Sequence, residues 1–362
     1  GLNGVTIQNA DGSITATTNL EGEVSIDGLN AGSTFVLELN RLGYAAQYVR
    51  TTIPEDTDLA YFEASMLQRE APVVVEKIES GGSFQGSDGV NVNLPVDGFV
   101  DQNGEVVTGE VNMSLTPLDV SDENSLRAFP GSFSAVTPNG FEDLLVTFGV
   151  AEYQFERDGE AVQLAPGKSA QIEIPVYITE SPNGGEFQPG DPFPLWSVDE
   201  TSGLWVEEGT GTVVESQNSP TGLAFRAEVT HFSWWNMDHA PSPYTVIPEC
   251  KIVDKNGLPT LDIPSGESCF VRGLPSSSGC AGGNIASTQI PSGTSIELPI
   301  PPDCNVTLFG SSAGGETGSV NVSGPSGGTV SVTIEMEAPS ADIETITVNE
   351  TEAILIITFF ET

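Results

Sequence analysis

The sequence predicts an all-β protein built from several β-sandwich domains in a row, with an extra strand at the C-terminal end. Almost no stretch has a sustained 3.6-residue apolar period, whereas apolar and polar residues alternate in many short segments. Turn pairs such as Asn103-Gly104 and Asp158-Gly159 separate these segments. Short strands recurring about every 8–12 residues are typical of sandwiches.

Length and charge limit the protein class. A chain of 362 residues is long enough for two to four domains, each with its own core. Its 51 acidic and 11 basic residues give a formal net charge of −40. Nucleic acid and anionic membranes would repel such a surface, so we expect neither as a partner. No apolar run reaches the roughly 18 residues of a membrane helix, which argues against membrane insertion.

The first predicted domain covers residues 1–69. Alternating segments SITATT, EVSID and FVLEL predict its strands. The stretches GVTI from Gly4, TNLEGEV from Thr18 and the pair Gly43-Tyr44 resemble the carboxypeptidase regulatory-like domain, a seven-stranded transthyretin-like sandwich of the broad immunoglobulin-like type. The resemblance implies a further strand just before Gly1. We therefore expect this domain to lack its first strand.

The middle region, residues 70–244, contains further alternating segments such as EVNMSL and AQIEIPVYI. Three stretches carry a resemblance: LPVDGFVDQNGEVVTGEVNMSLTPLD, PLWSVDETSGLWVEEGT and VTHFSWWNMD. They resemble the β-rich extracellular region of cartilage intermediate layer proteins and their bacterial relatives. The resemblance implies a β-rich fold and a bacterial source, and it implies no activity.

The third predicted domain covers residues 245–338, and its stretch CKIVDKNGLPTLDIPSGESCFV resembles the first domain with the opening strand present. All four cysteines lie here, and none belongs to a CxxC pair. Two disulfides, and therefore an oxidising compartment, follow from this pattern. Three pairings are open, of which we favour Cys269–Cys280 with Cys250–Cys304. Because Gly1 stands where Met would, we expect a secreted protein whose signal peptide has been removed.

Few residues suggest a chemical site. The stretch DVSDENS makes Asp119, Asp122 and Glu123 weak calcium candidates, although it lacks EF-hand spacing, and no other cofactor is expected. His231 and Asp238 could serve in a metal site with His239, or in a triad with a serine, but there is no G-x-S-x-G motif. The other interpretation is that a strand histidine satisfies a buried hydrogen bond. We expect no enzymatic activity.

The tryptophans are concentrated in one region, and they allow two interpretations. Cross-strand aromatic residues usually stabilise a hairpin and cap a core. An exposed group would instead form a platform that stacks a sugar ring, with glycans as partners. If residues 234–235 are extended, their side chains point to opposite faces, and one of them is then expected to be exposed. The residues are Trp196, Trp205, Trp234 and Trp235.

The tail, residues 339–362, ends in AILIITFF, which is too apolar to remain an exposed strand. We expect it to fill the missing-strand position of another subunit's first domain, which would yield a head-to-tail extracellular filament of identical subunits. The chain ends are expected to lie far apart. The alternative is a monomeric or anchored cell-surface adhesin or carbohydrate-binding protein with the tail packed on its own chain. The predicted interface residues are Gly4, Val5, Ile7, Ile354, Ile356, Phe359 and Phe360.

Overall fold

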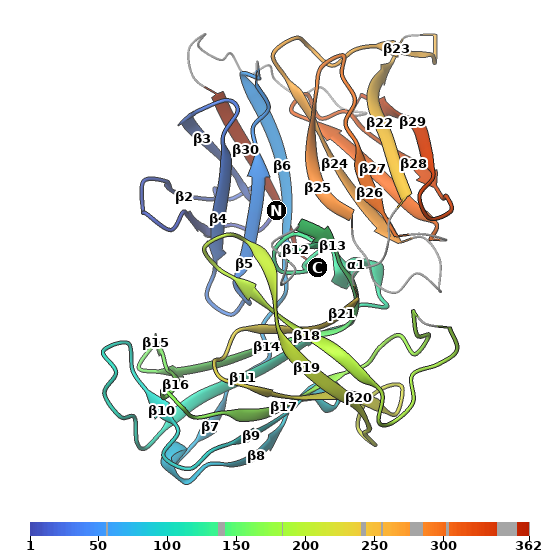
Figure 1. Ribbon diagram of the computed structural model, residues 1–362. Helices are drawn as coiled ribbons and strands as arrows, with labels where there is room; N and C mark the ends of the chain where they lie inside the picture. Colours follow the sequence, from blue (N-terminus) through green and yellow to red (C-terminus); the bar gives the residue numbers. More distant parts are fainter. Residues whose placement is uncertain are drawn as a thin grey trace.

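The computed structural model describes residues 1–361 except 56, 137–141, 183, 240–243, 255, 276–284, 302–303 and 339–352. Strands make up nearly all of the regular structure in these ranges and form five sheets (Figure 1). This confirms the predicted all-β, multi-domain fold with an additional C-terminal strand. Among the described helices, none has the length and apolar character needed to span a bilayer.

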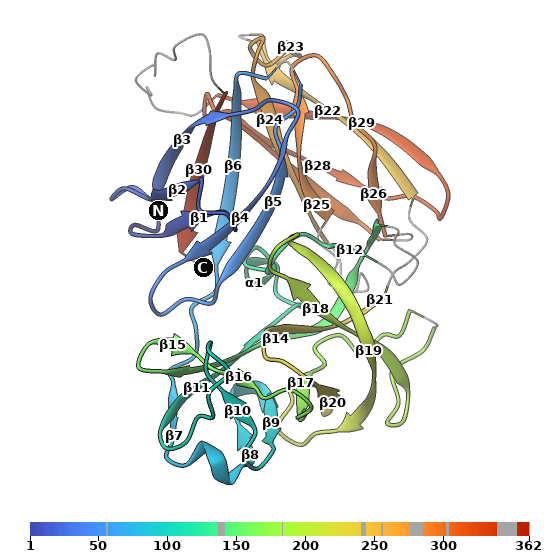
Figure 2. The same cartoon turned by 60° about the vertical axis from the view of Figure 1, so that its left-hand side comes forward.

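The first domain contains residues 1–66 together with the C-terminal strand, β30. One sheet has the strand order β2-β1-β4-β5 and the other β3-β30-β6 (Figure 2). Leu37 and Leu39 of β4 are fully buried in one core with Ile26 of β3 and Phe62 of β6, so the two sheets pack face to face. The strands are β1 Thr6–Gln8, β2 Thr15–Thr17, β3 Glu23–Leu29, β4 Thr34–Asn40, β5 Gln47–Thr52, β6 Leu59–Met66 and β30 Ala353–Glu361.

The middle domain has a large, curled sheet along the path β7-β11-β14-β21-β18-β19-β20-β17-β9-β8, with β12, β13 and β15 attached, and a small β10-β16 sheet. Burial on both faces of β14 and β21 divides its apolar residues between two cores. The elements are β7 Val73–Val75, η1 Ile78–Ser80, β8 Gly82–Gln85, η2 Ser87–Gly89, β9 Asn91–Leu94, β10 Phe99–Val100, β11 Val111–Leu118, α1 Glu123–Leu126, β12 Ser134–Val136, β13 Glu142–Leu144, β14 Val146–Arg157, β15 Glu160–Ala161, β16 Gln163–Leu164, β17 Ala170–Pro175, β18 Pro192–Asp199, β19 Leu204–Glu215, β20 Leu223–Val229 and β21 Trp234–His239.

The third domain has one eight-stranded sheet, with the path β23-β22-β29-β28-β27-β24-β25 and β26 paired to β22. Every second residue at the start of β22 is buried, so the predicted alternation faces a core inside this curved sheet. The strands are β22 Tyr244–Val253, β23 Pro259–Leu261, β24 Ser268–Pro275, β25 Ile285–Pro291, β26 Leu298–Ile300, β27 Val306–Ser312, β28 Thr317–Val322 and β29 Thr329–Glu337.

The cysteine pairing differs from the favoured one. Cys250 of β22 and Cys269 of β24 form a disulfide with their Cα atoms 6.6 Å apart. Cys304 is also in a disulfide, and Cys280 lies outside the described residues. The predictions of Cys269–Cys280 and Cys250–Cys304 are therefore wrong. In the β24–β25 hairpin Cys269 is opposite Ile290, and Cys269 and Cys250 instead belong to the same buried core.

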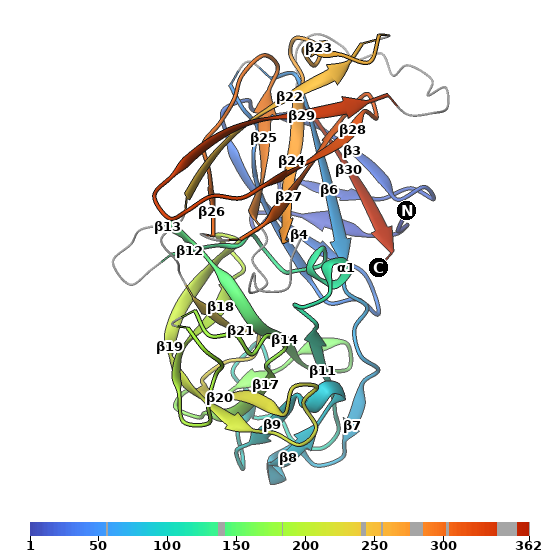
Figure 3. The ribbon, with the colours of Figure 1, turned by 90° about the vertical axis from the view of Figure 1, so that its right-hand side faces the viewer.

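The first and third domains lie side by side against the same end of the middle domain (Figures 1 and 3). Phe62 of β6 packs on Phe270 of β24 with ring centroids 4.7 Å apart. Gln289 donates from Nε2 to the Tyr61 carbonyl at 2.5 Å, and the backbone N–H of Leu59 donates to the Gly266 carbonyl at 3.0 Å. The expectation that the chain ends lie far apart is therefore wrong, because side-by-side packing brings the domains at the two ends of the chain together.

Candidate functional site

The C-terminal strand occupies the centre of a sheet in the first domain. β30 pairs parallel with β6, from Ile354↔Leu59 to Glu361↔Met66, and antiparallel with β3. In this three-stranded sheet β3 and β6 have no ladder with each other, so β30 alone joins them. We call the position between β3 and β6 the strand slot.

The slot differs from the predicted tail position. The tail was expected beside the strand that begins at Gly4, but β1 already pairs with β2 on one side and β4 on the other. Val5 and Ile7 are fully buried in the core, and Ile7 lies in β1 of the other sheet. The predicted pairing beside Gly4, Val5 and Ile7 is therefore wrong, because β1 has no free edge.

The register also shifts the predicted anchors. The buried β6 residues Ala60, Phe62 and Ala64 are opposite Leu355, Ile357 and Phe359. Among the four predicted interface residues of the tail, Phe359 is therefore the one opposite a member of this row, Ala64. Ile354, Ile356 and Phe360 are opposite Leu59, Tyr61 and Ser65 instead.

A second feature is a core shared by all three domains, which we call the junction core. It contains Tyr48 of β5, Trp205 of β19 and Leu274 of β24, one from each domain. Trp196 and Trp234 also belong to it, and each of these tryptophans is at most 2% exposed. Apolar burial between domains on this scale favours a fixed arrangement over loosely linked units.

The tryptophans therefore do not form a sugar platform. Trp235 lies in the other core of the middle domain and is 1% exposed. Trp234 and Trp235 do enter different cores, but the expected exposure of one of them is wrong, because both faces of β21 are covered. Sugar stacking needs an exposed aromatic face, which none of Trp196, Trp205, Trp234 or Trp235 offers.

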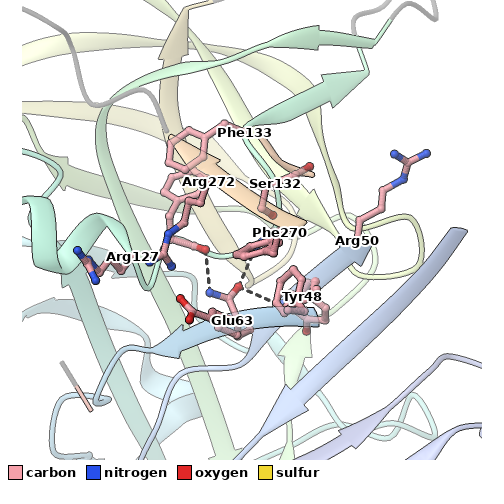
Figure 4. Close-up of a pocket in the computed structure, with 15 residues that line it drawn as sticks. Tyr48, Arg50, Glu63, Arg127, Ser132, Phe133, Phe270 and Arg272 are labelled. Carbon is pink, nitrogen blue, oxygen red and sulfur yellow. Dashed lines mark hydrogen bonds between the residues drawn. The ribbon is translucent and has the colours of Figure 1, made fainter. Parts of the chain in front are cut away.

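A small cavity of about 40 Å³ lies where the three domains meet, and we call it the junction cavity (Figure 4). Tyr48 and Glu63 come to it from the first domain, Ser132 from the middle domain and Arg272 from the third. In Figure 4 Arg272 lies within the labelled group, whereas the side chain of Arg50 points away from it.

One wall of this cavity is fully hydrogen-bonded. The Gln47 carboxamide, 5% exposed, donates from Nε2 to the Phe129 carbonyl at 2.8 Å. Its Oε1 accepts from the backbone N–H of Gly131 at 2.9 Å and from that of Tyr48 at 2.9 Å. Gly131 has a φ of +74°, a conformation that glycine adopts without strain. This side chain therefore links the first domain to the middle domain, in addition to the junction core.

Other residues of the lining are cationic and incompletely paired. Arg272 is 8% exposed, and burial lowers the pKa of its guanidinium, with Glu63 acting in the opposite direction and Arg127 adding to the decrease. Among the described residues, Arg272 Nε, Arg127 Nε and Ser132 Oγ are buried without a hydrogen-bond partner. Buried donors of this kind are uncommon in folded proteins.

The histidine and aspartate candidates are in two separate clusters. His231 Nε2 lies 2.9 Å from Glu208 Oε1, and Ser197 donates to the same oxygen. Asp238 is fully buried, and its Oδ2 accepts from Asn236 Nδ2 at 2.5 Å. Burial raises the pKa of the Asp238 carboxyl well above its usual range. A triad needs the histidine between the serine and the acid, so these contacts do not form one.

The calcium candidates have local protein partners. Asp119 accepts from the backbone N–H of Ser121 at 2.9 Å, and Asp122 caps α1 by accepting from the N–H of Ser125 at 3.0 Å. Glu123 lies 3.9 Å from Arg127. Within the described ranges no group of three His, Cys, Asp or Glu side chains converges as metal ligands would.

Several residues that position these features were not identified from the sequence. These residues are Gln47, Arg69 and Arg272. Arg272 lies in the otherwise apolar segment CFVRGL, whereas Arg69 lies in the polar run Gln68-Arg69-Glu70. A charged residue inside an apolar strand is a signal, since such residues are seldom fully buried unless paired. The signal does not indicate the partner, which comes from another domain.

The comparisons with known proteins are limited in coverage. No family model matches the chain, so the carboxypeptidase regulatory-like resemblance stays a prediction. A solved structure, the gamma-CGTase from alkalophilic Bacillus clarkii, aligns over 86% of this chain and 41% of its own at 11% identity, with a TM-score of 0.19. A score that low does not indicate a shared fold.

The sequence relatives support the other resemblance at low identity. Cartilage intermediate layer protein 1 of Mus musculus is 26% identical over 223 residues, which are 59% of this chain and 16% of that protein. The Homo sapiens protein is 24% identical over the same shares, and that of Sus scrofa 26% over 53% of this chain and 28% of its own. The chain is thus similar over rather more than half its length to cartilage intermediate layer protein 1 of three mammals, and it spans at most 28% of their length.

Proposed function

We propose that this chain is an extracellular structural protein that polymerises head to tail by exchanging β30 between neighbouring molecules. The observation that carries the proposal is the strand slot: the central strand of one sheet comes from the other end of the sequence. The slot can be filled by β30 of the same molecule or by β30 of a neighbouring molecule, and the residue pairs are the same in both cases. Exchange between chains is heterologous and yields open filaments unless it closes into a ring.

The connection to β30 supports this exchange. β29 ends at Glu337 and β30 begins at Ala353. The intervening chain spans at most roughly 50 Å, at about 3.3–3.6 Å per residue. That length is comparable to the diameter of a sandwich domain, so the same strand could fill its own slot or that of an adjacent molecule.

The extracellular location has independent support. A disulfide between Cys250 and Cys269 is typical of oxidising compartments. The mammalian relatives are named for a layer of cartilage. The proposal includes no catalytic activity, because His231 and Asp238 contact different partners. The bacterial source suggested by the sequence remains a prediction.

A second function is favoured by a specific observation. In one chain β30 fills the slot of its own first domain, and the first domain also packs against the third. A monomeric, extracellular adhesin with a permanently closed tail fits this arrangement. Its binding surface would be something other than the buried tryptophans.

Cysteine cross-linking separates the two functions. Glu23 is exposed and is directly opposite Thr358 in the β3–β30 pair, at a separation suited to a disulfide. Chains carrying only Glu23→Cys are co-expressed with chains carrying only Thr358→Cys, and covalent species are read on non-reducing gels. Exchange predicts linked dimers. The control combines Thr34→Cys, an exposed position in the other sheet, with Thr358→Cys and should give none.

A variant with both cysteines in one chain tests the alternative. If only the double variant Glu23→Cys/Thr358→Cys forms a bond, and it forms within one chain, the filament proposal is overturned and the monomeric function stands. Electron micrographs of the purified wild type supply the second readout, since exchange predicts polymers. Truncation after Pro339 should abolish them and destabilise the first domain, and a peptide of residues 340–362 should restore its melting temperature.

A further inference from the structure

The junction cavity carries an inference that is independent of filament formation. It is lined by residues of all three domains and has a volume of about 40 Å³. A water molecule needs at least about 10–15 Å³ of such space, so the cavity holds roughly three water-sized groups. This size suits a tetrahedral oxyanion and is too small for a nucleotide or a sugar.

The lining includes hydrogen-bond donors that have no partner in the part of the chain that the structure describes. Arg272 Nε, Arg127 Nε and Ser132 Oγ are buried and lack a partner among the described residues. Leaving such groups unpaired costs free energy, more so when the group is charged. On the same wall as Gln47, by contrast, each polar atom of the carboxamide is satisfied. The unpaired donors therefore belong to the two arginines and Ser132, and none belongs to Gln47.

The charged residues around the cavity also favour an anion. Three of the 11 lysines and arginines of this acidic chain border the cavity, namely Arg50, Arg127 and Arg272, although the Arg50 side chain points away from it. A guanidinium stays protonated even when buried, so Arg272 needs a countercharge. Glu63 lines the cavity and supplies part of that countercharge, and its Oε1 also accepts from the Tyr61 hydroxyl at 3.0 Å.

Arg127 has a separate acidic neighbour. Glu123 lies 3.9 Å from its Nη2 on the solvent side of α1, where Glu123 is 50% exposed. Arg127 Nε is nevertheless buried without a hydrogen-bond partner among the described residues, and the guanidinium lies over the Phe309 ring, 5.6 Å from its centroid. Arg272 and Arg127 thus present their Nε donors from different domains, without a carboxylate hydrogen-bonded to either atom among the described residues.

We propose that the junction cavity binds one small tetrahedral oxyanion, of the size of sulfate or phosphate, between Arg272 of the third domain and Arg127 and Ser132 of the middle domain. Bound there, the anion accepts from the unpaired donors and bridges two domains against the Gln47 wall of the first. Charge-assisted hydrogen bonds of this kind are about twice as strong as neutral ones. The anion would hold the three domains in one arrangement.

Calorimetric titration of the purified full chain tests this inference, with sodium sulfate and sodium phosphate as probes and sodium chloride at equal ionic strength as the reference. One saturable site per chain is expected for at least one oxyanion. Arg272→Met should weaken binding at least tenfold. The matched control, Arg226→Met, removes an exposed arginine on β20 and should leave binding unchanged.

Ser132→Ala provides a second, milder variant in case Arg272→Met does not fold. It removes one donor and should weaken binding severalfold while the circular dichroism spectrum stays unchanged. No saturable binding of either oxyanion to the folded wild type would overturn the inference. Equal affinities in the wild type, Ser132→Ala and Arg272→Met would overturn it too, because the anion would then bind elsewhere.

Discussion

Replacing Arg69 by methionine is expected to destabilise the chain by about 3–5 kcal/mol, the cost of breaking a buried ion pair from one side. Arg69 lies in the connection between β6 and β7, which joins the first domain to the middle domain. Its Nε and Nη2 donate to the two oxygens of Glu152 at 2.8 Å each. The Glu152 side chain is only 4% exposed, so loss of Arg69 leaves a buried carboxylate without a cation.

The magnitude follows from the asymmetry of the pair. The Arg69 side chain is 18% exposed and also lies 3.5 Å from Glu156, so it retains a countercharge when Glu152 is changed. Glu152→Gln should therefore cost less than Arg69→Met. The double variant, Arg69→Met with Glu152→Gln, should recover much of the loss, because the remaining glutamine carries no charge to bury.

Urea unfolding followed by tryptophan fluorescence measures these differences, since all four tryptophans lie in the middle domain that contains Glu152. Arg157→Met is the control: Arg157 is 46% exposed and 3.9 Å from Asp158, an exposed pair that contributes at most about 1 kcal/mol. The reasoning is refuted if Arg69→Met costs no more than Arg157→Met, or if the double variant is no more stable than Arg69→Met alone.

Three further predictions concern the pH response, the disulfide and the junction core. Partial desolvation raises the pKa of the Glu200 carboxyl, opposed by its hydrogen bond to Tyr48, although the residue as a whole is exposed. The folded chain therefore binds this proton more tightly and loses a small part of its stability as pH rises above about 4.5. Glu200→Gln should raise Tm at pH 7 and not at pH 3.5; an equal gain at both would contradict this. Non-reducing peptide mapping should recover Cys250 linked to Cys269, and a Cys269–Cys280 peptide would count against the structure. Trp205→Ala should cost about 3–5 kcal/mol in urea unfolding, and a loss under 1 kcal/mol would argue against its burial.

The strand pattern was predictable because a half-buried strand alternates its side chains with a period of two. The predicted segments EVSID and FVLEL lie within β3 and β4, and most of AQIEIPVYI forms β17. The apolar tail was also recognisable as a strand that needs cover, and it forms β30. These conclusions depend only on local sequence, which is why they did not require the fold.

What the sequence by itself determined about this protein is thus its class: acidic, strand-rich, disulfide-bonded, with a strand at its end that must be covered. Only the tertiary structure decided the partners. It paired Cys250 with Cys269, put β30 beside β3 and β6 instead of β1, and buried Trp205 and Arg272 between domains. Alternation shows that a residue faces inward, but it does not show what lies opposite, because neighbours in a sheet or a domain junction come from distant segments whose packing depends on the whole chain.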